Sequence, residues 1–179
     1  MACHPVVEWE VFEHFPRRTL RNRYEILSPQ GRFPLTIPVE RPNGSKTLTK
    51  DVLIADQANW RLDHLRSLQA CYRSSPYFDH YESEIEQLLL QESHGTIVDY
   101  AKKTTEWLLK QFGIGTQITL STLFNRDEMV LSTNSQAYHQ VFFGTSEFAK
   151  DLSAIDLLFN VGPEGRNLLL KICKEISHS

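Results

Sequence analysis

The sequence predicts a single α/β domain in which a mixed sheet packs with helices, and an α+β arrangement is the alternative. Three observations support this prediction. Segments with strand-like alternation come first, helical patterns fill the middle, and a further strand and helices follow. The chain has 179 residues, enough for one full domain and short for two, and no internal linker stands out. Its composition, 41% hydrophobic and 23% charged, is ordinary for a globular protein.

Residues 6–15 are predicted to form the first strand. Val7, Trp9 and Val11 alternate with two glutamates, which is the period-2 pattern of a strand with one polar face. We therefore expect this segment to lie in the sheet with its apolar side toward the core.

A hairpin is predicted next, with strands over 24–27 and 33–39. The run Ser-Pro-Gln-Gly at 28–31 is a good turn sequence between them. Pro34 and Pro38 lack N–H donors, so the second strand is expected at a sheet edge or with a bulge.

Two helices are predicted to follow the hairpin. Asn59 is a typical N-cap for a helix over 60–73. Ser75-Pro76 predicts the start of the second helix, because proline is favoured at the first helical position. The apolar stripe of this second helix is Phe78, Tyr81, Ile85, Leu88 and Leu89.

Two further helix starts resemble capping boxes, in which a hydroxyl and an acidic side chain three residues later bond each other's backbone. Thr96 and Asp99 form one such pair, and Ser153 and Asp156 form the other. The remaining predicted elements are a loop over 41–50, strands over 51–55, 117–124 and about 138–143, and helices over 97–112, 153–161 and 163–176.

The chain shows no sign of export or membrane insertion. No apolar run approaches the ~20 residues that a membrane span requires, and the start has no secretory signal. Cys3, Cys71 and Cys173 are scattered, and none belongs to a C-x-x-C pair, so neither a disulfide framework nor a thiolate zinc site is suggested. We expect a cytoplasmic protein with reduced cysteines.

The arginine segment, residues 17–23, is the densest basic run of a chain whose net charge is −3. Arg17, Arg18, Arg21 and Arg23 fall within it, and arginine binds phosphates and carboxylates through paired N–H groups. The segment predicts an anion-binding site, against the alternative of a solvated loop. The negative net charge and the absence of a recognised RNA- or DNA-binding signature argue against a nucleic-acid partner.

The predicted helix over 60–73 carries two polar residues, Arg61 and His64, on its apolar face. One interpretation is structural: an arginine–carboxylate pair and a buried histidine with satisfied hydrogen bonds. The other is that this face lines a cleft, with His64 as an acid or base and Arg61 as an anion clamp. The apolar residues of the face are Trp60, Leu62, Leu65, Leu68, Cys71 and Tyr72.

No sequence motif identifies a cofactor. The chain has no G-x-x-x-x-G-K-S/T loop, no G-x-G-x-x-G and no G-x-S-x-G elbow. His14 and His64 have no cysteine or carboxylate at metal-ligand spacing around them, so we expect no metal and no cofactor.

Four segments, in this order, resemble the WbqC-like family of bacterial proteins, and together they cover most of residues 13–164. They are Glu13 to Thr19 with Arg21-Asn22-Arg23; Leu35 to Val39; Trp60 with His64, Ala70, Tyr72, Ser75 to Phe78 and Tyr81; and Asp151 to Ser153 with Asp156 to Asn160 and Gly162 to Glu164. The resemblance implies a family often encoded among genes for O-antigen and other surface polysaccharides, with glycine transfer to a sugar suggested for members.

The resemblance adds a substrate class to the candidate residues, namely an anionic nucleotide- or lipid-linked sugar. On this hypothesis His14 or His64 manages the proton as the catalytic group, and the binding residues contact the precursor. These binding residues are Arg17, Arg21, Asn22, Arg23 and Arg61, together with Trp60 and Tyr72, which would pack on a sugar or base. The competing hypothesis is a non-catalytic protein that binds an anionic glycan precursor or a partner enzyme. The sequence leaves the oligomeric state open.

The chain departs from the usual family pattern at its start. Family members usually carry a further strand and helix before the segment that corresponds to residues 6–15. We therefore expect residues 1–179 to form one WbqC-like domain without that N-terminal segment.

Overall fold

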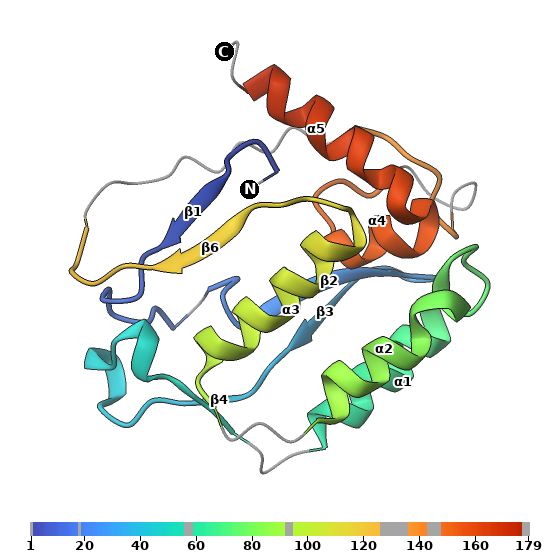
Figure 1. The fold of residues 1–179 in the computed structure, drawn as a ribbon. Helices are drawn as coiled ribbons and strands as arrows, with labels where there is room; N and C mark the ends of the chain where they lie inside the picture. The colour runs from blue at the N-terminus through green and yellow to red at the C-terminus, as the bar shows by residue number, and fades with distance from the viewer. Residues whose placement is uncertain are drawn as a thin grey trace.

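The computed structural model describes residues 2–17, 19–55, 59–91, 95–125, 136–142 and 148–176. In these residues the chain forms α-helices packed with small sheets, which confirms the predicted mixed α/β class (Figure 1). The strands form three separate pairs in the described part of the chain, where we expected one mixed sheet. Each strand has hydrogen bonds to a single partner strand in these residues, so the pairs do not join into one sheet.

The first pair joins β1 (Val6–Trp9) to β6 (Gln117–Leu120) in parallel. Both strands are shorter than the predicted 6–15 and 117–124. Beyond the two strands, the Glu10 carboxylate accepts hydrogen bonds from the N–H groups of Phe12 and Asn125, both at 2.6 Å, and so joins the segments that follow β1 and β6.

The second pair is the predicted hairpin, confirmed as β2 (Arg23–Ser28) and β3 (Gly31–Thr36) in antiparallel register. Its tight turn depends on Gly31, whose φ of +107° is strained for any residue with a side chain. β3 has β2 as its only partner strand in the described residues, so Pro34 lies at an edge, as expected.

The third pair is a short antiparallel contact between β4 (Val39–Glu40) and β5 (Leu53–Ile54). β4 overlaps the predicted strand 33–39 only at Val39, and β5 lies within the predicted strand 51–55. Two 3-10 turns, Gly44–Lys46 and Thr49–Asp51, lie in the predicted loop over 41–50 and extend to Asp51, the first residue of that predicted strand.

Helices α1 (Trp60–Tyr72) and α2 (Phe78–Leu90) pack side by side (Figure 1). The α1 bounds match the prediction, and Asn59 is the N-cap residue, although its side chain makes no capping bond. The predicted Ser75-Pro76 start is wrong, because α2 begins at Phe78. Ser75 instead closes the turn after α1, where its N–H donates to the Tyr72 carbonyl at 2.8 Å.

Helix α3 (Ile97–Gln111) has the predicted capping box. The Thr96 hydroxyl accepts from the Asp99 N–H at 3.1 Å, and the Asp99 carboxylate accepts from the Thr96 N–H at 3.4 Å. The helix gives way at Phe112 to Gly113, whose φ of +62° is the usual left-handed end of a helix.

Helix α4 (Ala154–Val161) connects to α5 (Gly165–Ile176) through a 3-10 turn, Gly162–Glu164. The short strand expected at about 138–143 is not formed in 138–142, and residue 143 lies outside the described residues. Glycine is required at position 162, because its φ is +67° and an added Cβ would lie 2.5 Å from the Tyr77 ring.

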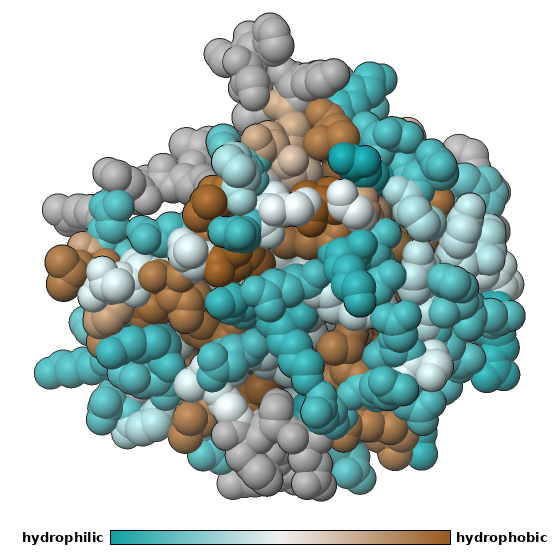
Figure 2. Space-filling view, viewed as in Figure 1, coloured by the Kyte–Doolittle hydropathy of each residue, from teal (hydrophilic) through white to brown (hydrophobic). Residues whose placement is uncertain are grey.

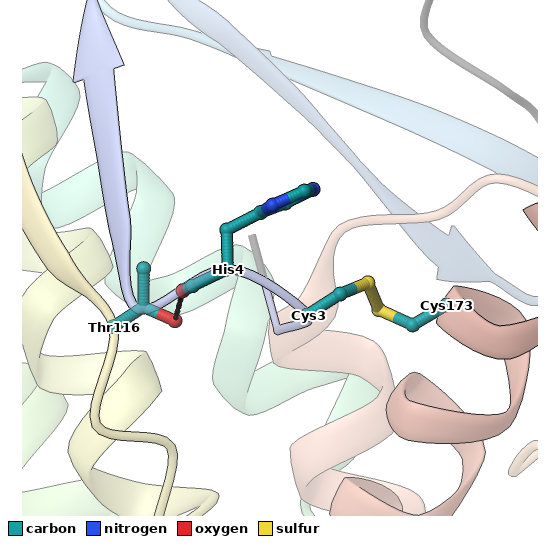
Figure 3. The surroundings of a disulfide bond; sticks show 4 residues. All are labelled: Cys3, His4, Thr116 and Cys173. Carbon is teal, nitrogen blue, oxygen red and sulfur yellow. Dashed lines mark hydrogen bonds between the residues drawn. A yellow bond between two sulfur atoms is a disulfide. The ribbon is translucent and has the colours of Figure 1, made fainter. Parts of the chain in front are cut away.

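A disulfide joins Cys3, in the segment before β1, to Cys173 in α5 (Figure 3). The expectation that all three cysteines are reduced is therefore wrong for this pair. Cys71 is free and buried in α1, as its apolar neighbours predicted. Beside the disulfide, the Thr116 hydroxyl donates to the His4 carbonyl at 2.8 Å and holds the segment against the start of β6.

One contiguous apolar core connects the helices and the strand pairs. Its largest fully buried side chains include Tyr72, Tyr81, Phe78 and Phe159. Polar side chains cover much of the face in Figure 2, with apolar residues between them. Leu123 and Phe124, which follow β6, are among the exposed large apolar residues.

Candidate functional site

Helix α1 presents its predicted apolar face to the core. His64 is only 4% exposed and lies on this face with Trp60, Leu68 and Cys71, as expected. The opposite face, which includes Asp63, Arg66 and Arg73, is exposed. The helix therefore carries an ionisable ring into the interior, where each ring nitrogen needs a hydrogen-bond partner.

Both ring nitrogens of His64 have partners. Nε2 lies 3.2 Å from the Thr36 carbonyl oxygen, so Nε2 carries the proton and donates it. Nδ1 lies 3.2 Å from the Tyr24 hydroxyl, which donates to it. Burial lowers the pKa of His64, and the hydrogen bond to Thr36 and the charge of Asp63 offset this only in part. His64 is thus a neutral ring that ties α1 to both strands of the β2–β3 hairpin.

Arg61 packs on aromatic rings. Its guanidinium lies 4.5 Å from the centre of the Trp60 ring and 5.9 Å from that of Tyr100. Its Nη1 donates to the Leu89 carbonyl at 3.1 Å, at the end of α2. These contacts connect α1, α2 and α3.

The arginine segment lies on the surface at the start of β2. Arg17, Arg21 and Arg23 are exposed, and position 18 lies outside the described residues. Arg21 pairs with Glu13 and also bonds the Thr19 hydroxyl at 3.2 Å. In the free protein Arg21 therefore already holds a carboxylate, that of Glu13.

Asn22 and His14, two other predicted site residues, have structural contacts here. The Asn22 amide donates to the Ile37 carbonyl at 2.9 Å, and the Ile37 N–H donates to the Asn22 carbonyl at 2.8 Å. His14 is exposed and forms an isolated bridge with Leu48, and it has no hydrogen bond to His64.

Arg23 and His64 lie on opposite sides of β2. Successive residues of a strand point to opposite faces, so Arg23 points away from Tyr24 and from the His64 ring that Tyr24 contacts. The structure thus brings Trp60, Arg61 and His64 together but does not join them to the arginine segment.

A polar cluster that the sequence did not predict lies where α1 meets α4. The Asp156 carboxylate is fully buried, and it accepts hydrogen bonds from the hydroxyls of Tyr72 at 2.5 Å and Tyr138 at 2.6 Å. The Tyr72 oxygen in turn accepts from the Leu27 N–H at 3.1 Å. We call Tyr72, Asp156 and Tyr138 the tyrosine–aspartate cluster.

This cluster corrects the predicted capping box of α4. Asp156 does not reach back to Ser153, and the Ser153 side chain makes no capping bond. The Asp156 N–H instead donates to the Ser153 carbonyl at 2.9 Å. One signal was present in the sequence: Tyr72 lies on the apolar face of α1, and a buried tyrosine hydroxyl needs a partner.

Burial dominates the electrostatics of the cluster. It raises the pKa of Asp156 above its usual range, and the hydrogen bonds from Tyr138 and Tyr72 offset this only in part. Burial, and then the nearby Asp156 charge, also raise the pKa values of Tyr72 and Tyr138, so both hydroxyls remain protonated donors.

A cavity of about 190 Å³ lies beside the cluster, between the segment 151–154 and helix α5. Tyr138 forms part of its wall, with Ser153 and Asp151 as further polar residues. The other lining residues are Gln136, Phe148, Leu152, Ala154, Leu157, Leu168, Leu169 and Ile172. The arginine segment and His64 do not line this cavity.

The described residues contain no group of three or more His, Cys, Asp or Glu side chains arranged to hold a metal ion. In the same part of the chain, no helix has the length and apolar character to cross a membrane.

These observations define a mixed α/β protein in which His64 and Asp156 are buried and hydrogen-bonded to tyrosine hydroxyls. A family model described as the WbqC-like protein family matches residues 11–136. This match covers more than half of the 179 residues, so the chain belongs to the WbqC-like family, as its motifs indicated. No significant match was found among curated proteins or solved structures. Family membership supports a role associated with polysaccharides.

Proposed function

We propose that this chain is a transferase of bacterial surface-polysaccharide (O-antigen) biosynthesis, which passes a glycyl or similar small acyl group to a nucleotide- or lipid-linked sugar. Family membership supports the connection with polysaccharides. The observation that favours catalysis is the hydrogen bond from Tyr138, a residue of the cavity wall, to the buried Asp156 carboxylate. The proposal takes residues 1–179 as one domain that acts in the cytoplasm.

The tyrosine–aspartate cluster suits the proton transfer that acyl transfer requires. As an acceptor hydroxyl or amine attacks the acyl carbon, its proton passes to the Tyr138 oxygen and the Tyr138 proton passes to Asp156. The new bond joins the acceptor to the acyl carbon, and the bond to the leaving group breaks with its electron pair on that group. A raised pKa of Asp156 favours this role, because a carboxylate that binds protons more readily is a better base.

We assign the proton to this cluster rather than to the histidines. Both ring nitrogens of His64 are occupied and its ring is buried, whereas His14 is exposed on a bridge to Leu48. Trp60 and Tyr72 are also buried, so their proposed contribution is to position His64 and Asp156 rather than to stack on a sugar.

The arginine segment supplies the proposed contact with the phosphate of the sugar precursor. Arg17 and Arg23 are exposed, and Arg21 would exchange Glu13 for the ligand. Arginine side chains bind phosphate oxygens through two parallel N–H donors, which a solvated lysine does not do.

The test compares two tyrosines that bond the same carboxylate. Tyr138→Phe is expected to lower the turnover of glycyl transfer to a nucleotide sugar by about 10²–10⁴-fold while sugar binding persists. Tyr72→Phe, whose hydroxyl also holds the Leu27 N–H, is the matched control and is expected to lower the melting temperature more than Tyr138→Phe. Mass spectrometry of the acceptor and a thermal melt give the two measurements. A Tyr138→Phe variant with unchanged turnover contradicts the catalytic assignment.

The second candidate is a non-catalytic protein that binds an anionic glycan precursor or a partner enzyme. The fully occupied ring of His64 favours it, because that histidine performs a structural task without a substrate. In this case nucleotide sugars bind, replacement of Arg21 and Arg23 by glutamine weakens binding, and no variant of the tyrosine–aspartate cluster changes any reaction.

A further inference from the structure

We infer that the cavity next to the Cys3–Cys173 disulfide is a second anion site, which binds a phosphate group, and that the disulfide holds it together. The cavity has a volume of about 180 Å³ and lies between three separate segments of the chain. They are the N-terminal residues 2–5, the loop 114–116 before β6, and the first turns of α5. The inference concerns other residues than the proposed transferase site and does not rest on it.

The ionisable side chains that line this cavity are basic. They are His4 and Arg166, and no carboxylate is among the lining residues. Arg166 is exposed and has no ion-pair partner among the described residues, and the His4 ring has no hydrogen-bond partner there. Arg21, by contrast, already pairs with Glu13. Side-chain donors around one cavity that have no protein partner favour the binding of an anion, because without it they hydrogen-bond only to water.

The size of the cavity suits a small anion. A dry cavity of about 150 Å³ in another protein accommodates benzene, which has six heavy atoms. A phosphate group has five, so it fits within 180 Å³ with room for water. Gly115 leaves this wall open, since a Cβ added there would contact nothing within 4 Å.

The disulfide is part of the wall itself. Cys3 lines the cavity and is bonded to Cys173 in α5 (Figure 3). Cys173 lies about one turn beyond Leu170, which lines the cavity from α5. On the other side of the segment, the Thr116 hydroxyl donates to the His4 carbonyl at 2.8 Å and the Gln117 N–H donates to the Pro5 carbonyl at 2.9 Å, whereas the covalent link to α5 is the disulfide. Cleavage of the disulfide therefore releases His4 from α5 and from Arg166, which separates the two basic groups.

The experiment is a titration of the isotope-labelled, oxidised protein with inorganic phosphate, followed by amide NMR at constant ionic strength. Saturable shifts are expected at Gly115 and Arg166. Arg166→Gln is expected to weaken binding at least tenfold, whereas Arg73→Gln, a change of an exposed arginine directly after α1, is expected to leave it within twofold. A nucleoside diphosphate provides the second arm. Similar affinity means that phosphate alone is recognised, and affinity more than tenfold higher means that the phosphate belongs to a larger ligand.

The role of the disulfide is tested in the same titration after reduction by a dithiol. The dithiol becomes a cyclic disulfide, and Cys3 and Cys173 become thiols. Reduction is expected to weaken phosphate binding at least tenfold. Shifts confined to residues 19–23, or equal affinity for Arg166→Gln and the parent protein, overturn the site. An unchanged affinity for phosphate after reduction overturns the proposal that the disulfide holds the site together. Arg166→Gln keeps the site testable if the reduced protein does not fold.

Discussion

At the scale of single residues, the chemistry of this protein depends on which polar groups are buried. Asp156 and His64 both lie in the interior with complete sets of hydrogen-bond partners, but burial shifts their pKa values in opposite directions. Burial disfavours the charged form of each group, which is the protonated form of histidine and the deprotonated form of aspartate. The two residues therefore affect stability at opposite ends of the pH range.

Asp156 is expected to make the folded protein less stable as the pH rises. Its folded pKa is raised, so its contribution to stability is fully present below the unfolded value of about 3.9 and is lost as the pH passes the folded pKa. Asp156→Asn cannot ionise and is expected to lack this loss. Urea denaturation of both proteins from pH 4 to pH 8 measures it, with the exposed Asp79→Asn as control. Parallel curves for Asp156→Asn and the parent protein would show that the carboxyl is not shifted.

His64 is expected to act in the acid range. Its folded pKa is lowered, so its contribution is present above about 6.5 and is lost as the pH falls through the folded pKa. At pH 7.5 His64→Leu is expected to cost about 1–3 kcal/mol, because the Tyr24 hydroxyl and the Thr36 carbonyl lose their partner. This cost should shrink below pH 6. Thermal melts at the two pH values check it, with the exposed His80→Leu as the matched change. A cost that grows in acid contradicts the assignment.

At the scale of elements, local sequence patterns predicted the positions of helices better than the hydrogen bonds that cap their N-termini. The capping box at Thr96 formed because Thr96 and Asp99 are near the surface, where each side chain bonds the backbone N–H of the other. The same pattern at Ser153 failed because Asp156 lies on the buried side of α4, where two tyrosine hydroxyls from distant segments take its oxygens. The position of Tyr72 on the apolar face of α1 indicates that its hydroxyl needs a partner, but local spacing does not identify Asp156 as that partner.

The Thr96 cap offers a direct test of element stability. Thr96→Ala is expected to lower the free energy of unfolding by about 1 kcal/mol, because the Asp99 N–H loses its acceptor at the start of α3. Thr96→Ser keeps the hydroxyl and is expected to retain most of that stability. Chemical denaturation of the three proteins gives the comparison. Equal losses in the alanine and serine variants would assign the effect to the threonine methyl group.

The sequence also predicted the helix faces and the hairpin but not how the strands associate. The apolar arc of α1 and the turn at 28–31 follow from periodicity and turn chemistry, which are local. The parallel pairing of β1 with β6 joins residues more than 100 positions apart, and so does the hydrogen bond from the Asn125 N–H to Glu10, which no local pattern indicates. The sequence does not show on which face of β2 each side chain lies, so it placed the arginine segment and His64 in one site, whereas in the structure Arg23 points away from His64.

At the scale of the whole molecule, the disulfide is expected to be a major source of stability. It links residues 170 positions apart, and the entropy that a cross-link removes from the unfolded chain grows with the length of the loop. Cys3→Ser is expected to lower the free energy of unfolding by about 2–5 kcal/mol. The reduced parent protein serves as control and should match the variant. Identical denaturation curves for oxidised and reduced protein would show that the bond adds nothing. The thiol state in cells also tests the proposed cytoplasmic location, where disulfides are rare.

The same bond turns the chain into a nearly closed covalent ring, from position 3 to position 173. A single protease cut anywhere between these positions leaves one molecule of unchanged mass apart from one added water. The nicked protein would run as one band on a denaturing gel without reductant and as two fragments once the thiols are free. A single cut in a surface loop therefore does not release either fragment. The backbone of this protein can be broken while the molecule stays in one covalent piece.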